Sequence, residues 1–228
     1  MMALSLLTLG LAAPALAAPA TAESVAGDTE EVRQFLEDHG VDAQTQDTLL
    51  DALANGEVWD SMSADALPVS TRSEVTTDST STIETFADGS IVVTEIETPQ
   101  EARGGVAAKA VTGCRTTVSG TGYSNRYDCK ASASTGLVLM GFYISYSITG
   151  SWDSIIEVHS PYGQCSGGTC TSPTLSVQKS TENASGSAWA RSRMTFTGAL
   201  GTGGGTYEMR ALVGGNTAWT RWELKGIE

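Results

Sequence analysis

The sequence predicts a mainly β fold, in which a C-terminal antiparallel β-sandwich or barrel with disulfides follows a short segment of two helices and a β-hairpin. Three observations predict this fold. β-Prone segments fill the second half of the chain, Gly-rich joints separate them, and all four cysteines fall in that half. Short strands at this spacing, with no helical stretch between them, are typical of antiparallel sandwiches and barrels.

The disulfide-stapled β domain is expected over residues 107–228. One long segment alternates apolar and polar residues, which places its apolar side chains on one face of a strand. Residues 188–196 also alternate, with Ser192 as a polar residue among the apolar ones of one face. The expected strands cover roughly residues 114–118, 127–131, 137–148, 154–159, 174–178, 188–196, 207–213 and 218–224.

The cysteine spacing predicts disulfides. The two spacings are C-x14-C and C-x4-C, which differ from the C-x2-C pairs of zinc sites, so no metal is expected. An even cysteine count in an exported chain is typical of disulfide bonds. Four cysteines allow three pairings, and we favour the nearest neighbours, Cys114–Cys129 and Cys165–Cys170.

The first 22 residues predict export. An apolar run from Met2 to Leu16 precedes three small-x-small sites, which is the pattern of a cleavable signal peptide. The alternative is a membrane anchor, but Pro14 and Pro19 interrupt the stretch, and a spanning helix needs about 20 apolar residues. We therefore expect a secreted, extracellular protein with no membrane span after cleavage.

The charge is divided unevenly along the chain. Residues 1–100 contain 18 acidic and 2 basic side chains, whereas residues 101–228 contain 8 acidic and 11 basic ones, and the whole chain has a net charge of −13. Residues 23–100 therefore form an acidic segment, and this segment is also a candidate propeptide. Residues 101–106 form a linker or processing site, or else an exposed turn. Nucleic acid is not an expected partner, because phosphate contacts need dense Lys and Arg.

The acidic segment contains two short amphipathic helices and a hairpin. The first helix is expected to begin at Asp28 or Thr29 and to end at Gly40, and the second to span about residues 44–55, with Gly56 as its stop. An Asp88-Gly89 turn between β-prone runs then predicts a hairpin. Because an isolated hairpin is marginal, it must pack on another element.

One aromatic and basic set of residues has binding potential. Trp189, Arg191 and Arg193 share one face of an expected strand, and Trp219 and Arg221 share one face of the last strand. If the two strands are neighbours, these side chains form an outward ladder. Exposed Trp and Arg are enriched at binding hot spots. The alternatives are that the ladder only covers the sheet, or that it lies beneath the acidic segment.

Catalytic signals are weak. His159 is the one histidine of the β domain, and Asp128, Asp153 or Glu157 are candidates to orient it as a base, but no G-x-S-x-G nucleophile elbow is present. No pair of carboxylates is brought together by its spacing. We therefore expect no catalytic residue and no cofactor.

Two short sequence segments of the acidic part resemble those of known proteins. Residues 56–62 (GEVWDSM) and residues 86–90 (FADGS), followed by a Cys-containing β domain, resemble precursors of secreted bacterial proteins of unknown function. The resemblance implies export and this architecture, and it implies no activity.

The function that these observations favour is extracellular binding without catalysis. The ligand is expected to be a glycan, a component of the cell envelope or a protein. One alternative is a proprotein whose acidic half masks a basic effector, such as a toxin or an inhibitor. The other alternative is a secreted hydrolase.

Overall fold

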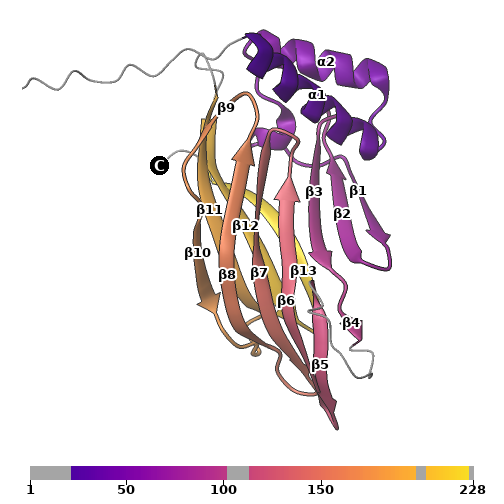
Figure 1. The fold of residues 1–228 in the computed structure, drawn as a ribbon, viewed down its shortest axis with the longest axis vertical. Coiled ribbons are helices and arrows are strands. Elements are labelled where there is room, and N and C mark those ends of the chain that lie inside the picture. Colours follow the sequence, from indigo (N-terminus) through magenta and orange to yellow (C-terminus); the bar gives the residue numbers. More distant parts are fainter. Residues whose placement is uncertain (1–21, 102–112, 199–203, 226–228) are drawn as a thin grey trace, which may run out of the picture.

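The computed structural model describes residues 22–101, 113–198 and 204–225. Two sheets pack face to face as a β-sandwich, and two helices lie at one end of it (Figure 1). The mainly β fold class is confirmed, and the helices precede the strands in the chain. The predicted signal peptide lies outside the described residues except for Ala22, and the predicted linker does so except for Glu101.

The first sheet has eight strands and includes the hairpin of the acidic segment. β7 pairs with β6 along its whole length, so β3 and β5 share the other edge of β6, and β1 and β2 extend the sheet beyond β3. The strands are β1 (Ser70–Val75), β2 (Ser79–Thr85), β3 (Ile91–Glu97), β4 (Gln100–Glu101), β5 (Arg115–Gly120), β6 (Tyr123–Ser134), β7 (Val138–Thr149) and β8 (Ser154–Cys165).

The second sheet has five strands, with the order β10-β11-β12-β13 and with β9 beside the end of β11. All pairs in this sheet are antiparallel. Its strands are β9 (Gly168–Cys170), β10 (Thr174–Lys179), β11 (Ala188–Gly198), β12 (Gly204–Gly214) and β13 (Thr217–Lys225). All eight strands expected in the second half are present, although several are longer than expected.

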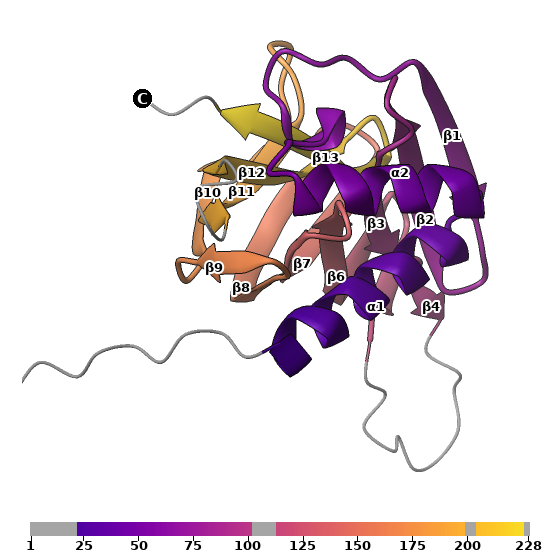
Figure 2. The ribbon, with the colours of Figure 1, turned by 90° about the horizontal axis from the view of Figure 1, so that it is seen from above.

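The helices are α1 (Ala22–Asp38) and α2 (Ala43–Ala54), followed by the 3-10 helix η1 (Asp60–Met62). α2 lies close to its expected bounds, because the side chain of Asp42 accepts hydrogen bonds from the N–H groups of Gln44 and Thr45 as an N-cap. α1 begins six residues before the expected Asp28, so residues 22–27 continue the helix. Seen from above, both helices lie across the end of the sandwich (Figure 2).

The two segments that carry the resemblance, residues 56–62 and 86–90, contact each other in the fold. The N–H group of Asp60 donates to Oδ2 of Asp88 at 2.8 Å, and the N–H group of Asp88 donates to Oδ2 of Asp60 at 3.2 Å. The N–H group of Ser61 donates to Oγ of Ser90 at 3.0 Å. Trp59 is buried and donates its indole N–H to the carbonyl of Leu49. These contacts attach the helical part to the β2–β3 turn.

Both predicted disulfides are formed, Cys114–Cys129 and Cys165–Cys170. The first is buried at the start of β5, and the second is partly exposed beside β9. The apolar core runs from the helices through both sheets as one cluster. It includes the expected inner residues of β7 and of β11, with the buried Ser192 among them.

At the end of the sandwich opposite the helices, two carboxylates accept hydrogen bonds from loops of both sheets. Asp153, only 1% exposed, accepts hydrogen bonds from the N–H groups of Thr149 and Asn216 at 2.8 Å each. Glu182 accepts from the N–H groups of Asp153 and Gly215. Since these loops belong to both sheets, the two carboxylates fix the sheets relative to each other.

Candidate functional site

The outer face of the second sheet carries the predicted aromatic and basic residues. Side chains of β11 and β12 alternate, and the inner set is buried against the first sheet. The outer set, with its partners on β13, is named here the Trp–Arg face. It consists of three rows of cross-strand partners: Trp189, Leu212 and Trp219; Arg191, Arg210 and Arg221; Arg193, Glu208 and Glu223.

The expected ladder differs from this arrangement in one respect. β11 and β13 are not neighbours, because β12 lies between them. The five predicted residues still share a face, but Leu212, Arg210 and Glu208 of β12 separate the two groups.

Glu208 is the centre of the face. Its side chain has no exposed surface, although it lies on the outer side of the sheet. Its carboxylate lies 3.4 Å from Nη1 of Arg191, 2.9 Å from Nε of Arg193 and 2.6 Å from Nε of Arg210. A buried carboxylate is tolerated when charged partners surround it. The three arginine side chains therefore cover Glu208 and are held in place by it.

Arg210 connects the three rows. Besides Glu208, it contacts Glu223 of β13 through Nη2 at 2.7 Å. Its guanidinium carbon also lies 4.6 Å from the centre of the Trp189 ring, which is a cation–π contact. Such contacts contribute about 0.5–1 kcal/mol at exposed sites. Arg210 thereby orients one tryptophan of the face as well as both carboxylates.

The face has a positive balance in an acidic protein. It holds four arginines against two glutamates, whereas the whole chain has a net charge of −13. Arg221 of β13 is exposed. Burial raises the pKa of Glu84 of β2, and the positive charge of Arg221 opposes this rise. The ion pairs of Arg191 and Arg193 are with Glu208 of their own sheet.

Sequence reasoning missed Arg210 and Glu208. The signal that identifies them is the alternation within β12, where Tyr207, Met209 and Ala211 are buried. The residues between them must then point outward, to the same face as Arg191 once β12 is placed beside β11. Only the strand order supplies that last step.

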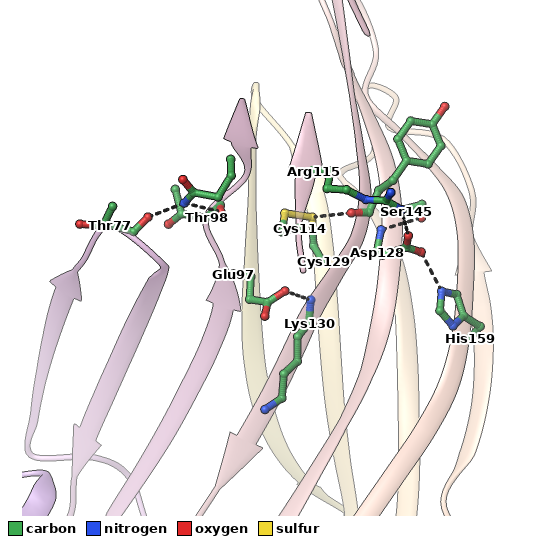
Figure 3. The surroundings of a disulfide bond; sticks show 12 residues. Thr77, Glu97, Thr98, Cys114, Arg115, Asp128, Cys129, Lys130, Ser145 and His159 are labelled. Carbon is green, nitrogen blue, oxygen red and sulfur yellow. Dashed lines mark hydrogen bonds and ion pairs between the residues drawn. A yellow bond between two sulfur atoms is a disulfide. The ribbon is translucent and has the colours of Figure 1, made fainter. Parts of the chain in front are cut away.

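A second polar cluster lies beside the buried disulfide on the first sheet, as Figure 3 shows. Asp128 forms an ion pair with Arg115 and lies 3.2 Å from Nε2 of His159. Nδ1 of His159 lies 3.0 Å from Oγ of Ser160. We name Arg115, Asp128, His159 and Ser160 the Asp128–His159 cluster.

Irregular backbone positions this cluster. Asp128 and Ser160 have positive φ angles of 55° and 50°, and the strand register shifts beside each of them. Such bulges re-aim side chains and occur next to functional sites. The Arg115 guanidinium, and to a lesser degree His159, lower the pKa of Asp128, while partial burial opposes this. The His159 ring stacks on Tyr143, with centroids 5.6 Å apart.

The contacts of Ser160, His159 and Asp128 have the order of a Ser-His-Asp relay. The His159 and Asp128 side chains are, however, 36% and 40% exposed. A cavity of about 450 Å³ lies elsewhere, lined by residues that include Glu31, Phe35 and Cys165. Another, of about 160 Å³, lies beside the β12–β13 turn. The other two candidate partners of His159 lie apart from it in the hydrogen-bond network: Asp153 binds backbone at the end of the sandwich, and Glu157 pairs with Ser145 in the ladder.

Two further findings concern the described ranges alone. Within residues 22–101, 113–198 and 204–225, no three His, Cys, Asp or Glu side chains gather as metal ligands would. In the same ranges, neither helix has the length and apolar character needed to cross a membrane.

The fold and its surface define a disulfide-bonded β-sandwich with an arginine-rich sheet face. Comparisons with protein-family models, curated proteins and solved structures found no match to this chain.

Proposed function

We propose that the protein is exported and binds an extracellular ligand through the Trp–Arg face, without catalysing a reaction. The observation that carries this proposal is the unexposed Glu208 beneath three arginines, with Trp189 and Trp219 on the other side of the central arginine row. A ligand that meets side chains already held in place loses less conformational entropy on binding. Trp and Arg are also the residues that most often dominate binding energy.

Export is supported by the N-terminal apolar run with its small-residue sites and by the two disulfides. Disulfides persist in oxidising compartments, so this chemistry suits an extracellular protein. The ligand classes that fit such a location are a glycan, a component of the cell envelope or another protein.

The experiment measures binding of the secreted, full-length mature protein to immobilised polysaccharides, bacterial cell-wall preparations and extracellular proteins. Trp219→Ala is compared with Trp152→Ala, because Trp152 is 50% exposed on the β7–β8 turn, away from the face. We expect Trp219→Ala to weaken binding and Trp152→Ala to leave it unchanged. Equal binding by both variants, or no binding to any surface by the unmodified protein, contradicts the proposal.

A second candidate function, a hydrolase, is favoured by one specific observation, the Ser160–His159–Asp128 contacts. In such a reaction Oγ of Ser160 attacks an acyl carbon, His159 accepts the serine proton and passes it to the leaving group, and water then releases the acyl group. A fluorophosphonate probe tests this candidate, because it modifies an activated serine covalently. Mass spectrometry that finds Ser160 unmodified, under conditions that label a control serine hydrolase, excludes it.

A further inference from the structure

We infer that the ligand of the Trp–Arg face is an acidic polysaccharide. This inference rests on the proposed function, since it names the chemical class that the same face recognises. The evidence comes from the charge of the face, its unused hydrogen-bond donors, the position of its tryptophans and the polar residues around it.

The charge that a ligand meets on this face is positive. Glu208 has no exposed surface and Glu223 is 22% exposed, whereas the three arginine side chains that cover Glu208 are 22–38% exposed. A ligand therefore contacts guanidinium groups and not the carboxylate beneath them. Arg221, which is exposed and lies outside the Glu208 contacts, extends the same row across β13. An anion is complementary to this surface.

The arginines retain donors for an anion. The contacts with Glu208 engage one nitrogen of Arg191 and one of Arg193, whereas a guanidinium has five N–H donors in a planar fork. The fork matches the two oxygens of a carboxylate or of a sulfate or phosphate group. The contacts within the face thus orient the guanidinium groups without exhausting them.

The tryptophans favour an extended polymer with ring units. Trp189 and Trp219 lie in one row with Leu212 between them, so their strands are separated by two strand spacings, about 10 Å. The arginine row runs parallel to them two residues further along the strands, at about 7 Å. A chain that crosses the strands therefore meets an aromatic row on one side and a cationic row on the other.

The surroundings favour a polyhydroxylated ligand over a protein surface. Thr174 and Ser176 of β10 pair with Arg193 and Arg191, and Thr195 and Thr206 form a hydroxyl contact of 3.2 Å beyond the glutamate row. The centre of a protein–protein interface is rich in apolar side chains and depleted of Glu, although Arg is enriched there. The centre of this face instead holds Glu208 and its three arginines.

The experiment uses pairs of polymers that differ only in charge: polygalacturonate with its methyl ester, and dextran sulfate with dextran. Titration calorimetry with the intact mature protein is expected to show binding to at least one charged member of a pair. It is also expected to show at least about tenfold weaker binding to the neutral member, the change produced by loss of about one charge-assisted contact. Binding is expected to weaken as salt is raised, because salt screens exposed charges.

Variants assign the binding to the face. Arg221→Gln is expected to weaken binding to the charged polymer by about tenfold and Arg221→Lys to restore part of it, since Lys keeps the charge and loses the fork. Lys130→Gln, at an exposed position of the first sheet, removes the same charge as a control and is expected to have no effect.

The outcomes separate the two proposals. If the neutral polymers bind as tightly as the charged ones and Trp219→Ala still weakens binding, the face binds a ligand but the acidic class is wrong. If neither charged polymer binds, the proposal of an acidic polysaccharide is also wrong, even if the face binds another ligand. If Trp219→Ala and Arg221→Gln bind every surface as the unmodified protein does, the proposed function falls as well.

Discussion

At the scale of residues, Glu208 shows how a carboxylate on the outer side of a sheet becomes a structural centre. Its three arginine partners come from two strands, and their aliphatic stems and guanidinium groups exclude water from it. Without this carboxylate, the hydrogen bonds from Arg191 and Arg210 and the ion pair with Arg193 are lost, and like charges repel each other.

The substitution Glu208→Gln tests this interpretation. It removes the charge and keeps the size, so we expect a loss of about 1–3 kcal/mol in the free energy of unfolding, measured by urea denaturation. Glu157→Gln, at an exposed position of β8, is the control and is expected to change the value by less than about 0.5 kcal/mol. Equal values for both variants contradict a structural role for Glu208.

Asp128 predicts a dependence of stability on pH. Its pKa is lowered from the ordinary 3.8, first by Arg115 and then by His159. Because the folded-state pKa lies below the unfolded one, the stabilisation is present above about pH 4 and is lost as the pH falls through the lowered value. The Arg115–Asp128 ion pair is partly exposed, so we expect it to contribute about 0.2–1 kcal/mol to the free energy of unfolding.

The measurement compares the unmodified protein with Asp128→Asn in urea at pH 7 and near pH 2. We expect the variant to be less stable at pH 7 and the difference to shrink at the acidic pH. Asp65→Asn, at an exposed position, controls for the loss of one negative charge. A difference that is constant between the two pH values excludes the titration of Asp128 as its cause.

At the scale of elements, the two disulfides hold loops of different length. Cys114 and Cys129 are 15 residues apart and buried, whereas Cys165 and Cys170 are 5 residues apart and partly exposed. In the chain-entropy account, closing the longer loop contributes about 3 kcal/mol and closing the shorter one about 2 kcal/mol. The longer loop also attaches β5 to β6 beside the Asp128–His159 cluster.

Removing each disulfide as a pair of Cys→Ala substitutions tests this difference. Cys114→Ala with Cys129→Ala is expected to lower the free energy of unfolding by about 1 kcal/mol more than Cys165→Ala with Cys170→Ala. Urea denaturation of both variants and of the intact protein measures it. A larger loss from the shorter loop contradicts the prediction.

At the scale of the whole molecule, the acidic segment is built into the sandwich. β3 pairs with β6 over Val93–Ile96, and Ile91, Val92 and Val93 are buried in the shared core. One alternative for the Trp–Arg face was that it lies beneath the acidic segment, whose charge is opposite to that of the arginines. In the structure, backbone hydrogen bonds and apolar burial join β3 to the second half. Arg191, Arg193 and Arg210 of that face pair with Glu208, and Arg221 acts on Glu84 of the acidic segment.

This arrangement predicts how the halves associate when they are produced as two chains, residues 23–101 and 107–228. Apolar burial is nearly insensitive to moderate salt, whereas attraction between exposed charges is screened. We therefore expect the two co-expressed chains to purify together at both about 0.1 M and about 1 M salt. Dissociation at the higher salt alone indicates that charge attraction holds the halves together.

The sequence alone indicated most of the elements and favoured the disulfide pairing that the structure has. Alternation with a period of two marks β7 and β11 because a strand sends successive side chains to opposite faces, and Asp88-Gly89 marks the β2–β3 turn because Gly89 adopts a positive φ of 85°. The Cys165–Cys170 and Cys114–Cys129 pairs followed from proximity in the chain. These features are local, so neighbouring residues are sufficient to indicate them.

Only the tertiary structure decided the composition of the Trp–Arg face and of the Asp128–His159 cluster. Glu208 is a centre because β12 lies between β11 and β13, and strand order is set by the packing of the whole core. Asp128 and His159 are 31 residues apart and meet because bulges in β6 and β8 re-aim them across β7. Periodicity places a side chain on a face, but it contains no information about which strand lies beside it. The order of the strands depends on free-energy differences summed over the whole molecule.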